Sequence, residues 1–361
     1  MTRRKPVPTE VTFFKRVLRG TGFLPFIIKR VFTSILLIFG MTFISFTITQ
    51  LVPGDPVAAN LGQSAYSDPT IVAAFEQEFG LDQPVPVQYI RYVQNLSQGN
   101  LGISLSSKRP VVEDLREYFP ATVEIALIAV VIALVLGLIL GTISAVTRDR
   151  LPDQIIRVFS LTGVSMPTFW TALVAFYVFF FVLGWAPGTG RLDPGVDAPN
   201  QVTGIFTIDA LIAGDIEIFQ QALSYLLLPA IVLAIYALGV LTRFTRASIL
   251  EILGNDYVRT ARAKGLPEIT VIRRHVLRPA LLAIITVAGV SFASLMAGSV
   301  LVENVFSWPG LGQYAYRAAV GLDLPGIMGV SMVVATVYIT MNLIVDILYR
   351  VIDPQLRKAE Q

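Results

Sequence analysis

Residues 125–147 read IALIAVVIALVLGLILGTISAVT and contain no charged side chain. The hydrocarbon core of a bilayer is about 30 Å thick, and a helix needs roughly 20 apolar residues to cross it. Five other uncharged stretches meet the same requirement: Val31–Gly54, Val158–Gly190, Ile218–Thr242, Pro279–Val302 and Leu324–Val345. Each must be helical, because lipid offers no hydrogen-bond partner to the backbone. The sequence therefore predicts an all-α membrane protein with six transmembrane helices.

The third and the first of these stretches differ from an ordinary span in length or position. Val158–Gly190 is longer than a span requires, and we expect it to leave the membrane near Gly184. The first stretch is not a cleavable signal peptide, because it is too long and has no small-residue cleavage pattern before Pro53. We therefore expect residues 31–52 to remain in the protein as its first transmembrane helix.

The composition agrees with a membrane protein and excludes several classes of function. Hydrophobic residues make up 54% of the chain and charged residues only 15%, whereas soluble domains carry about 25% charged residues. The chain has no cysteine, which excludes disulfides, thiolate zinc sites and cysteine nucleophiles. The single histidine, His275, lies among arginines, and we expect it to be a solvated surface residue rather than a ligand.

The distribution of positive charge predicts the orientation. Of the 28 lysines and arginines, 22 fall in residues 1–30, 148–157 and 243–278 and in the tail from Arg350. These segments all lie on one side of a six-span topology. Because cytoplasmic loops carry an excess of Lys and Arg, both termini are expected in the cytoplasm.

The chain divides around these spans. We expect a basic cytoplasmic arm, the first helix, an extracytoplasmic segment, a five-helix core containing a cytoplasmic loop, and a cytoplasmic tail, at residues 1–30, 31–52, 53–119, 120–350 (loop 243–278) and 351–361. The arm could form a short interfacial helix or act only as a positive anchor for the first span. The extracytoplasmic segment contains two candidate helices, Thr70–Phe79 and Val87–Leu96, and Gly80 ends the first.

The loop at 243–278 is far longer than the 2–8 residues usual between packed helices. Asp256 can cap a helix that runs to Lys264, and Gly265 suits the left-handed residue that ends it. Pro267 then fits the first turn of a new helix. We expect two short helices that meet at a glycine elbow on the cytoplasmic surface.

This elbow has the composition of a docking site. Tyr257, Ala261 and Leu266 would form an apolar knob, and a basic ring would surround it, made of Arg259, Arg262 and Lys264. Such a knob could seat in a groove of a separate soluble motor and pass movement to both adjoining spans. A basic segment held to anionic lipid is the alternative, and the turn chemistry at Gly265 favours docking.

The run Asp256–Leu266 (DYVRTARAKGL) resembles the cytoplasmic loop signature of ABC importer permeases, with Gly265 as its central glycine and Arg259 where the general pattern has an acid. Elsewhere the chain resembles the B-type subunit of dipeptide and oligopeptide permeases. The matching runs occur in family order: Leu51–Pro56, Gly80–Pro84, Gly99–Gly102, Pro120–Glu124, Ser165–Trp170, Phe306–Gly312 and Asp353-Pro354. Each run alone is a weak signal, but the ordered set is a strong one.

The resemblance implies a type I ABC importer permease fold in a bacterial or archaeal cell (inner) membrane. It implies that the loop forms coupling helices on the ATP-binding subunits, through Asp256, Tyr257, Arg259, Ala261, Arg262, Lys264, Gly265 and Leu266. The implied partners are a second homologous permease, two ATP-binding subunits, an extracytoplasmic solute-binding protein and the lipid bilayer, with no nucleic acid. No phosphate-binding loop of the form Gly-x-x-x-x-Gly-Lys-Ser/Thr occurs in the sequence. We therefore expect no enzyme activity or cofactor on this chain, and ATP and Mg on the partner subunits.

Two further motifs are candidates for the pore or its gate. Ser165, Pro167 and Trp170 lie within the third stretch, where the proline would kink the helix toward the pore; ordinary helix packing is the alternative. Trp308 and Pro309 follow the fifth span and could form a re-entrant gate loop, or Trp308 could be an aromatic belt residue in a turn.

Other functions remain open but less favoured. Glu124, Glu303 and Asp346 border the spans and invite a proton-coupled carrier, yet none falls at the middle of a span. An intramembrane enzyme would need a buried base, and the only histidine lies outside the spans. The resemblance makes peptides the expected substrate; nickel complexes, glutathione and oligosaccharides are alternatives, and no substrate ligand can be named from the sequence.

Overall fold

We describe a computed structural model of the chain, which defines residues 23–51, 55, 57–58, 60–61 and 66–352. Predictions for the arm before residue 23, for residues 52–54 and for the tail from residue 353 lie outside this part. The helices are α2 (Phe23–Leu51), α4 (Pro69–Phe79), α5 (Val85–Ser97), α6 (Val111–Val146), α7 (Leu151–Ser165), α8 (Thr168–Phe176), η1 (Tyr177–Val182), α9 (Phe206–Ala213), α10 (Ile216–Leu253), α11 (Asp256–Ala263), α12 (Glu268–Thr270), η2 (Val271–Leu277), α13 (Arg278–Gly298), α14 (Val300–Val305), α15 (Leu311–Val320) and α16 (Leu324–Ile352). The described residues contain no strand, only one isolated bridge.

The all-α fold class is confirmed, and the described helices agree with the six predicted spans when one bent pair is counted as a span. Five helical segments of the described chain are long and apolar enough to cross a membrane, namely Ile27–Leu51, Val111–Val146, Ile216–Leu253, Glu268–Gly298 and Leu324–Leu348. A bent pair, Leu151–Ser165 with Thr168–Val182, makes up to six when it is counted as one span.

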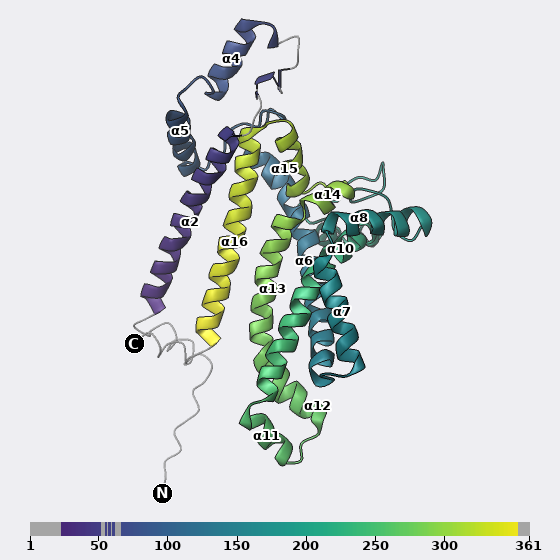
Figure 1. The fold of residues 1–361 in the computed structure, drawn as a ribbon. Coiled ribbons are helices and arrows are strands. Elements are labelled where there is room, and N and C mark those ends of the chain that lie inside the picture. The colour runs from purple at the N-terminus through teal and green to yellow at the C-terminus, as the bar shows by residue number, and fades with distance from the viewer. Residues whose placement is uncertain (1–22, 52–54, 56, 59, 62–65, 353–361) are drawn as a thin grey trace.

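The third predicted span is not one long helix. α7 and the α8–η1 segment are bent by 100° at the break between them. Met166 is extended there (φ −77°, ψ 130°) because it precedes Pro167, and the proline has no N–H to continue the helix. The α8–η1 segment runs sideways from the bundle (Figure 1) and ends at Val182, close to the expected exit near Gly184.

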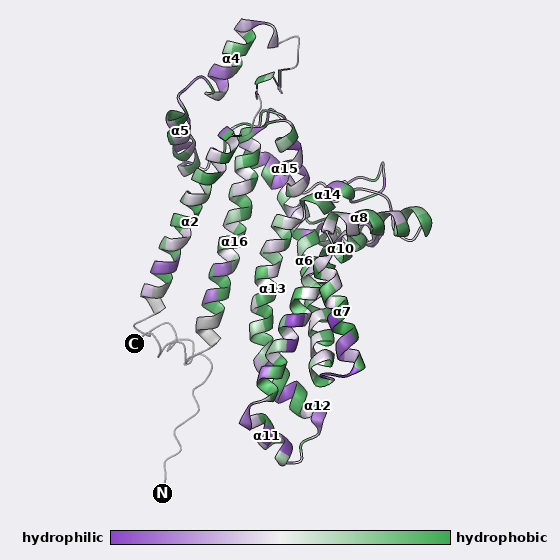
Figure 2. Ribbon diagram, in the orientation of Figure 1, coloured by the Kyte–Doolittle hydropathy of each residue, from purple (hydrophilic) through white to green (hydrophobic). Residues whose placement is uncertain are grey.

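The two ends of the bundle differ in what they carry. The start of α2, the end of α16 and both short helices α11 and α12 lie toward one end, which we call the inner end (Figure 1). α4, α5 and α15 lie at the opposite, outer end. Hydrophilic residues gather on α11 and α12, whereas α13 is mostly apolar along its length (Figure 2). The described ends of the chain therefore lie on the same side as the loop at 243–278, as the charge distribution predicts.

The core of the bundle is the contact between α6 and α10. A Cβ on Gly137 would lie 2.9 Å from the Leu241 Cβ, and one on Gly141 would lie 2.5 Å from the Thr245 Cβ. Small residues at these positions let the two backbones approach closely, which is how helices associate in lipid.

The helices extend beyond the predicted spans. α6 begins at Val111, so Pro120 lies inside a helix rather than at the start of the core. α10 runs on to Leu253 and makes the first part of the cytoplasmic loop a rigid extension of the span. The short outer helices α9, α14 and α15 were not predicted. α4 follows its prediction and ends at Gly80, whose φ of 68° is left-handed.

Candidate functional site: the inner elbow and the outer cap

We call α11, α12 and the residues between them the elbow. The expected two short helices are present, but the capping residue differs from the prediction. Asn255 is the N-cap of α11, with extended backbone and no side-chain capping bond. Asp256 is the first residue inside the helix, and its carboxylate lies 3.5 Å from the Arg259 guanidinium at the surface.

The turn at Gly265 defines the angle of the elbow. Gly265 has φ +75°, as the glycine pattern predicts, and its N–H donates to the carbonyl of Arg262 at 2.9 Å. Arg262 also reaches across the turn and makes two hydrogen bonds to the Glu268 carboxylate, at 2.5 and 3.1 Å. This carboxylate raises the pKa of Arg262 above its usual value. The ion pair was missed in the sequence because its spacing of six residues across a turn matches no helical pattern.

The exposed apolar face of the elbow is only partly the predicted knob. Tyr257 and Leu266 are exposed as expected, but Ala261 is buried with Val258 and belongs to the core. Ala261 points inward because it lies three residues after Val258, on the same face of α11. Ile269, which was not predicted, takes its place at the surface with 78% of its area exposed.

The elbow presents an exposed surface that is joined to two spans. Arg259 and Lys264 are exposed beside the apolar residues, so the surface combines hydrophobic contacts with positive charge. Beneath this surface, Val258 of α11 and Val271 and Val276 of η2 are fully buried, so both elements pack against the bundle. The elbow is therefore packed against the bundle and continuous in sequence with α10 on one side and, through η2, with α13 on the other.

The predicted pore residues of the third span come together at its break. Ser165, Pro167 and Trp170 line one shallow hollow with neighbours on α7 and α8. All three side chains are exposed in the single chain. The hollow therefore lies on the surface of this chain, where lipid or a neighbouring subunit could contact it.

Trp308 and Pro309 do not join that hollow. Trp308 is buried, and its Nε1 donates to the Ala121 carbonyl on α6 at 2.9 Å. Leu311 N donates to the Thr122 hydroxyl at 2.7 Å. The interpretation of Trp308 as an aromatic belt residue is wrong, because its ring is enclosed by protein. We call residues 120–124 together with 299–313 the outer cap.

Glu303 is the centre of the outer cap. Its carboxylate is fully buried and accepts hydrogen bonds from the hydroxyls of Thr122 (2.8 Å) and Ser299 (2.7 Å) and from Gln313 N (3.0 Å). Cβ atoms on Gly310 and Gly312 would lie 2.6 and 2.8 Å from Glu303 Oε2. The glycines of the Trp-Pro-Gly-Leu-Gly run are thus needed so that the chain can close around this carboxylate.

A buried ion pair holds the loop between η1 and α9 against the outer cap. Arg191 donates to Glu124 at 2.5 Å, and both side chains are almost fully buried. Glu124 also accepts from the Thr207 N–H and hydroxyl, while the Arg191 guanidinium lies 3.4 Å from the ring centroid of Phe206. Burial lowers the pKa of Arg191 below its usual value, although Glu124 opposes the shift. Sequence reasoning marked Glu124 as a border acid but missed its partner, 67 residues away.

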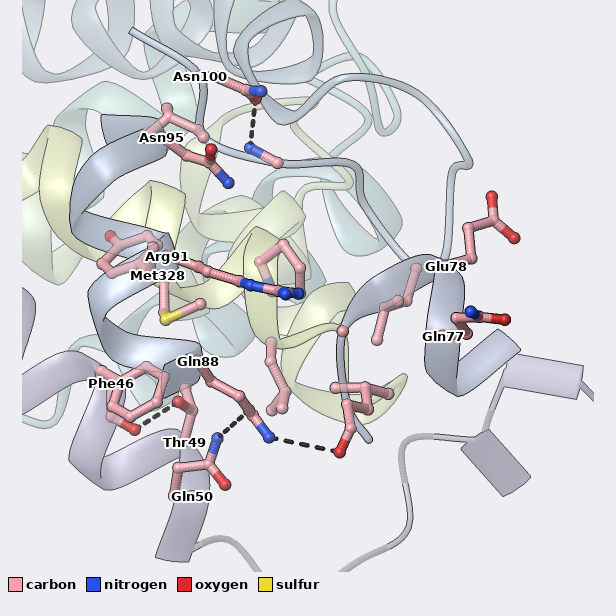
Figure 3. A pocket seen from close by; sticks show the side chains of 18 residues that line it. Phe46, Thr49, Gln50, Gln77, Glu78, Gln88, Arg91, Asn95, Asn100 and Met328 are labelled. Carbon is pink, nitrogen blue, oxygen red and sulfur yellow. Dashed lines mark hydrogen bonds between the residues drawn. The ribbon is translucent and has the colours of Figure 1, made fainter. Parts of the chain in front are cut away.

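A pocket of about 260 Å³, lined by both polar and apolar side chains, lies at the outer end between α2, α5 and the start of α16. Arg91 crosses the middle of this pocket, with Asn95 and Asn100 on one side and Gln50 and Gln88 on the other (Figure 3). Gln50 donates to Gln88 at 3.1 Å, which ties α2 to α5. The pocket brings together residues that no sequence motif links, and it was not predicted.

Comparison with known proteins identifies the family. The family model described as "Binding-protein-dependent transport system inner membrane component" matches residues 133–358, and its N-terminal companion matches residues 23–126. The chain is 43% identical to the probable D,D-dipeptide transport system permease protein DdpB of Escherichia coli, over 92% of this chain and 97% of the relative. It is 42% identical to the di/tripeptide transport system permease protein DppB of Pseudomonas aeruginosa, over 92% and 99%.

A solved structure of the MetNI methionine ABC transporter is more distantly similar. It has a TM-score of 0.45 and 17% identity, and the match covers 63% of this chain and 93% of that one. This similarity is too weak to bear on function. The family assignment rests on the sequence matches, which together span nearly the whole described chain. The chain belongs to the family of binding-protein-dependent transport system inner membrane components.

Proposed function

We propose that this chain is the permease subunit of an ATP-driven importer of short peptides and forms half of the transmembrane pathway. Three relatives from Escherichia coli and Pseudomonas aeruginosa are named as permeases for D,D-dipeptides, di- and tripeptides, or dipeptides, at 40–43% identity. Each match covers 92% of this chain. Agreement along the whole chain, rather than in one motif, supports the same substrate class.

A binding-protein-dependent importer works with an ATPase and a solute-binding protein. In our proposal the complete complex contains a second homologous permease, two ATP-binding subunits and one extracytoplasmic binding protein. ATP and Mg bind to the ATP-binding subunits and not to this chain. The observation that carries the proposal is the elbow, an exposed, basic and apolar surface at the inner end, built on a left-handed glycine between two spans.

The geometry suggests how the subunit would work. The ATP-binding subunits close on ATP and displace the elbow, which passes the movement to α10 through α11 and to α13 through η2. The spans then change from inward-open to outward-open, and the peptide released by the binding protein follows the path between the paired permeases. Ser165, Pro167 and Trp170 stay predicted pore residues, because they line the hollow that a neighbouring permease would face.

The experiment is Gly265→Val in the complex reconstituted in proteoliposomes with its ATP-binding subunits and binding protein. A β-branched residue at φ +75° costs about 1–2 kcal/mol, and each 1.4 kcal/mol is a factor of ten in an equilibrium. We expect co-purification of the ATP-binding subunits, or peptide uptake per ATP, to fall about tenfold, while membrane insertion is normal.

The matched control is Gly214→Val. Gly214 ends α9 with φ +73° and, like Gly265, has open space where a Cβ would be. The backbone strain is therefore equal, but the site lies on the outer side. Gly214→Val should leave ATPase association unchanged. Normal uptake and normal co-purification in Gly265→Val would contradict the coupling role, as would an equal loss in both variants.

A further inference from the structure

A carboxylate is completely buried near the inner end of the bundle. Asp153 lies in the first turn of α7, and its side chain has no exposed surface. It accepts a hydrogen bond from the Ser144 hydroxyl of α6 at 2.5 Å and from the Asp149 backbone N–H at 3.0 Å. Asp149 takes the left-handed conformation (φ 64°) that this tight turn requires and that Asp tolerates. These bonds fix the start of α7 to the end of α6.

The remaining contacts of this carboxylate come from α10. Arg246 Nε and Nη2 each donate to one carboxylate oxygen of Asp153, both at 2.8 Å. The paired, parallel geometry is the strongest form of an Arg–carboxylate contact and fixes orientation as well as distance. We call Ser144, Asp153 and Arg246 the clasp. It joins three helices, and its two ion-paired residues, Asp153 and Arg246, are 93 residues apart in the sequence.

The same two helices, α7 and α10, are also in backbone contact farther along. A Cβ on Gly239 of α10 would lie 2.6 Å from the Ser160 carbonyl oxygen of α7. A Cβ on Gly163 of α7 would lie 3.1 Å from the Ile235 carbonyl oxygen of α10. Glycines on both helices therefore let the backbones approach closely, and the clasp adds the directional bonds that fix the position of α7 on α10.

Both ends of this unit adjoin the proposed machinery. α10 continues past Arg246 to Leu253 and then enters the elbow through α11. α7 ends at Ser165, directly before the break at Pro167. The path from the elbow to the hollow at Ser165 thus runs up α10 and across the clasp into α7.

We propose that Asp153 and Arg246 are positioning residues of the transport cycle: the clasp makes α7 move with α10, so that displacement of the elbow reaches the broken span. The proposal rests on the function proposed above. A buried ion pair can also be merely structural, and breaking one destabilises a protein in either case. The test must therefore measure coupling, not only stability.

The experiment uses Asp153→Asn and Arg246→Lys in the reconstituted complex and measures peptide molecules imported per ATP hydrolysed. Arg246→Lys keeps the charge but loses the two-pronged geometry. We expect this ratio to fall about five- to tenfold in both variants, while the ATP-binding subunits still co-purify and hydrolyse ATP. Arg243→Lys is the matched control, because Arg243 lies on the same helix, is exposed and donates only to its own helix at Gly239. It should leave the ratio unchanged.

An unchanged ratio in Arg246→Lys would overturn the proposal, even if its thermal stability fell. Should Asp153→Asn fail to accumulate, Arg246→Lys decides alone, because it keeps a cation beside the buried carboxylate. The wild-type complex separates the two proposals. If it imports no peptide at the expense of ATP, the proposed function fails; if it does and the clasp variants match it, only the clasp fails.

Discussion

The helix pair α6–α10 and the helix pair α2–α16 are both apolar enough to cross a membrane but are packed very differently. In the most apolar part of each helix, 61% of α10 and 39% of α6 are buried, against 11% of α2 and 17% of α16. Gly137 and Gly141 of α6 have no room for a Cβ against α10, whereas Gly40 of α2 has open space around it. Hydropathy therefore identifies a helix that can cross the membrane. Whether the helix belongs to the core depends on whether its small residues pack closely against a neighbouring helix.

The difference also indicates what the peripheral pair is for. Large side chains such as Phe32, Leu36 and Phe43 are exposed along α2, so lipid or a partner subunit must cover them in the membrane. α2 contacts the rest of the chain through α16 and α5. The pair thus packs at the periphery of the bundle, and α2 contributes Gln50 to the outer pocket, beside Gln88 of α5.

Gly141→Val would break this comparison most directly. A Cβ at Gly141 would lie 2.5 Å from Thr245 Cβ and 2.8 Å from the Thr242 carbonyl oxygen, so α6 and α10 would have to separate. Overpacking of this kind costs about 3 kcal/mol, and we expect most of the protein to be lost from the monodisperse fraction after detergent extraction. The same change at Gly40, where no neighbour lies within 4 Å, should leave the yield and the thermal midpoint as in the wild type.

An equal loss of monodisperse protein in the Gly141→Val and Gly40→Val variants would mean that α6 and α2 are packed equally tightly. Size-exclusion chromatography of both variants from the same expression host measures this. No assay of transport is needed for the comparison.

Glu303→Gln tests whether the outer cap belongs to the rigid core. Glutamine offers one acceptor oxygen where hydroxyl and backbone donors converge, and its NH2 group would face those donors. Leaving a buried donor unpaired costs about 1–3 kcal/mol, and the thermal midpoint should fall by several degrees. Glu113→Gln is the control, since this carboxylate is more than half exposed. A midpoint equal to that of the control would show that the cap adds nothing to stability.

The smallest effect is expected at the contact between α2 and α16. Arg30 and Asp346 form an ion pair at 2.6 Å, with side chains 45% and 27% exposed. Exposed pairs of this kind contribute about 0–1 kcal/mol, so Arg30→Gln should shift the thermal midpoint slightly, and high salt should remove the shift. A large shift that persists in high salt would place this pair in the core and weaken the comparison.

Sequence patterns predicted the features that depend on local chemistry. The uncharged stretches predicted the spans. Gly265 and Pro267 predicted the bend of the elbow, because a left-handed residue and a residue without an N–H each end or start a helix at their own position. Pro167 predicted a kink in the third span. The size of the bend depends on how α8 packs against the outer cap, where the Phe176 and Phe306 rings meet edge to face at 5.5 Å.

The features that were missed or wrong depend on contacts between distant segments. Trp308 was left as either a gate-loop residue or an aromatic belt residue, and neither interpretation included its hydrogen bond to Ala121, 187 positions away. Asp153 was not noticed, since an aspartate at the start of a helix is ordinary and only the fold brings Arg246 to it. Ala261 was assigned to the outer face of the elbow because the burial of α11 against η2 is not visible in the sequence.

The ion pair between Arg262 and Glu268 has a consequence for recognition. It joins the two sides of the turn within this chain, so that this ion pair supports the angle that Gly265 gives to the elbow. A surface that is already preorganised loses little conformational entropy on association. A partner would therefore bind an elbow that is already ordered. Little of the free energy of association would be needed to order the loop, and more would remain to displace α10 and α13.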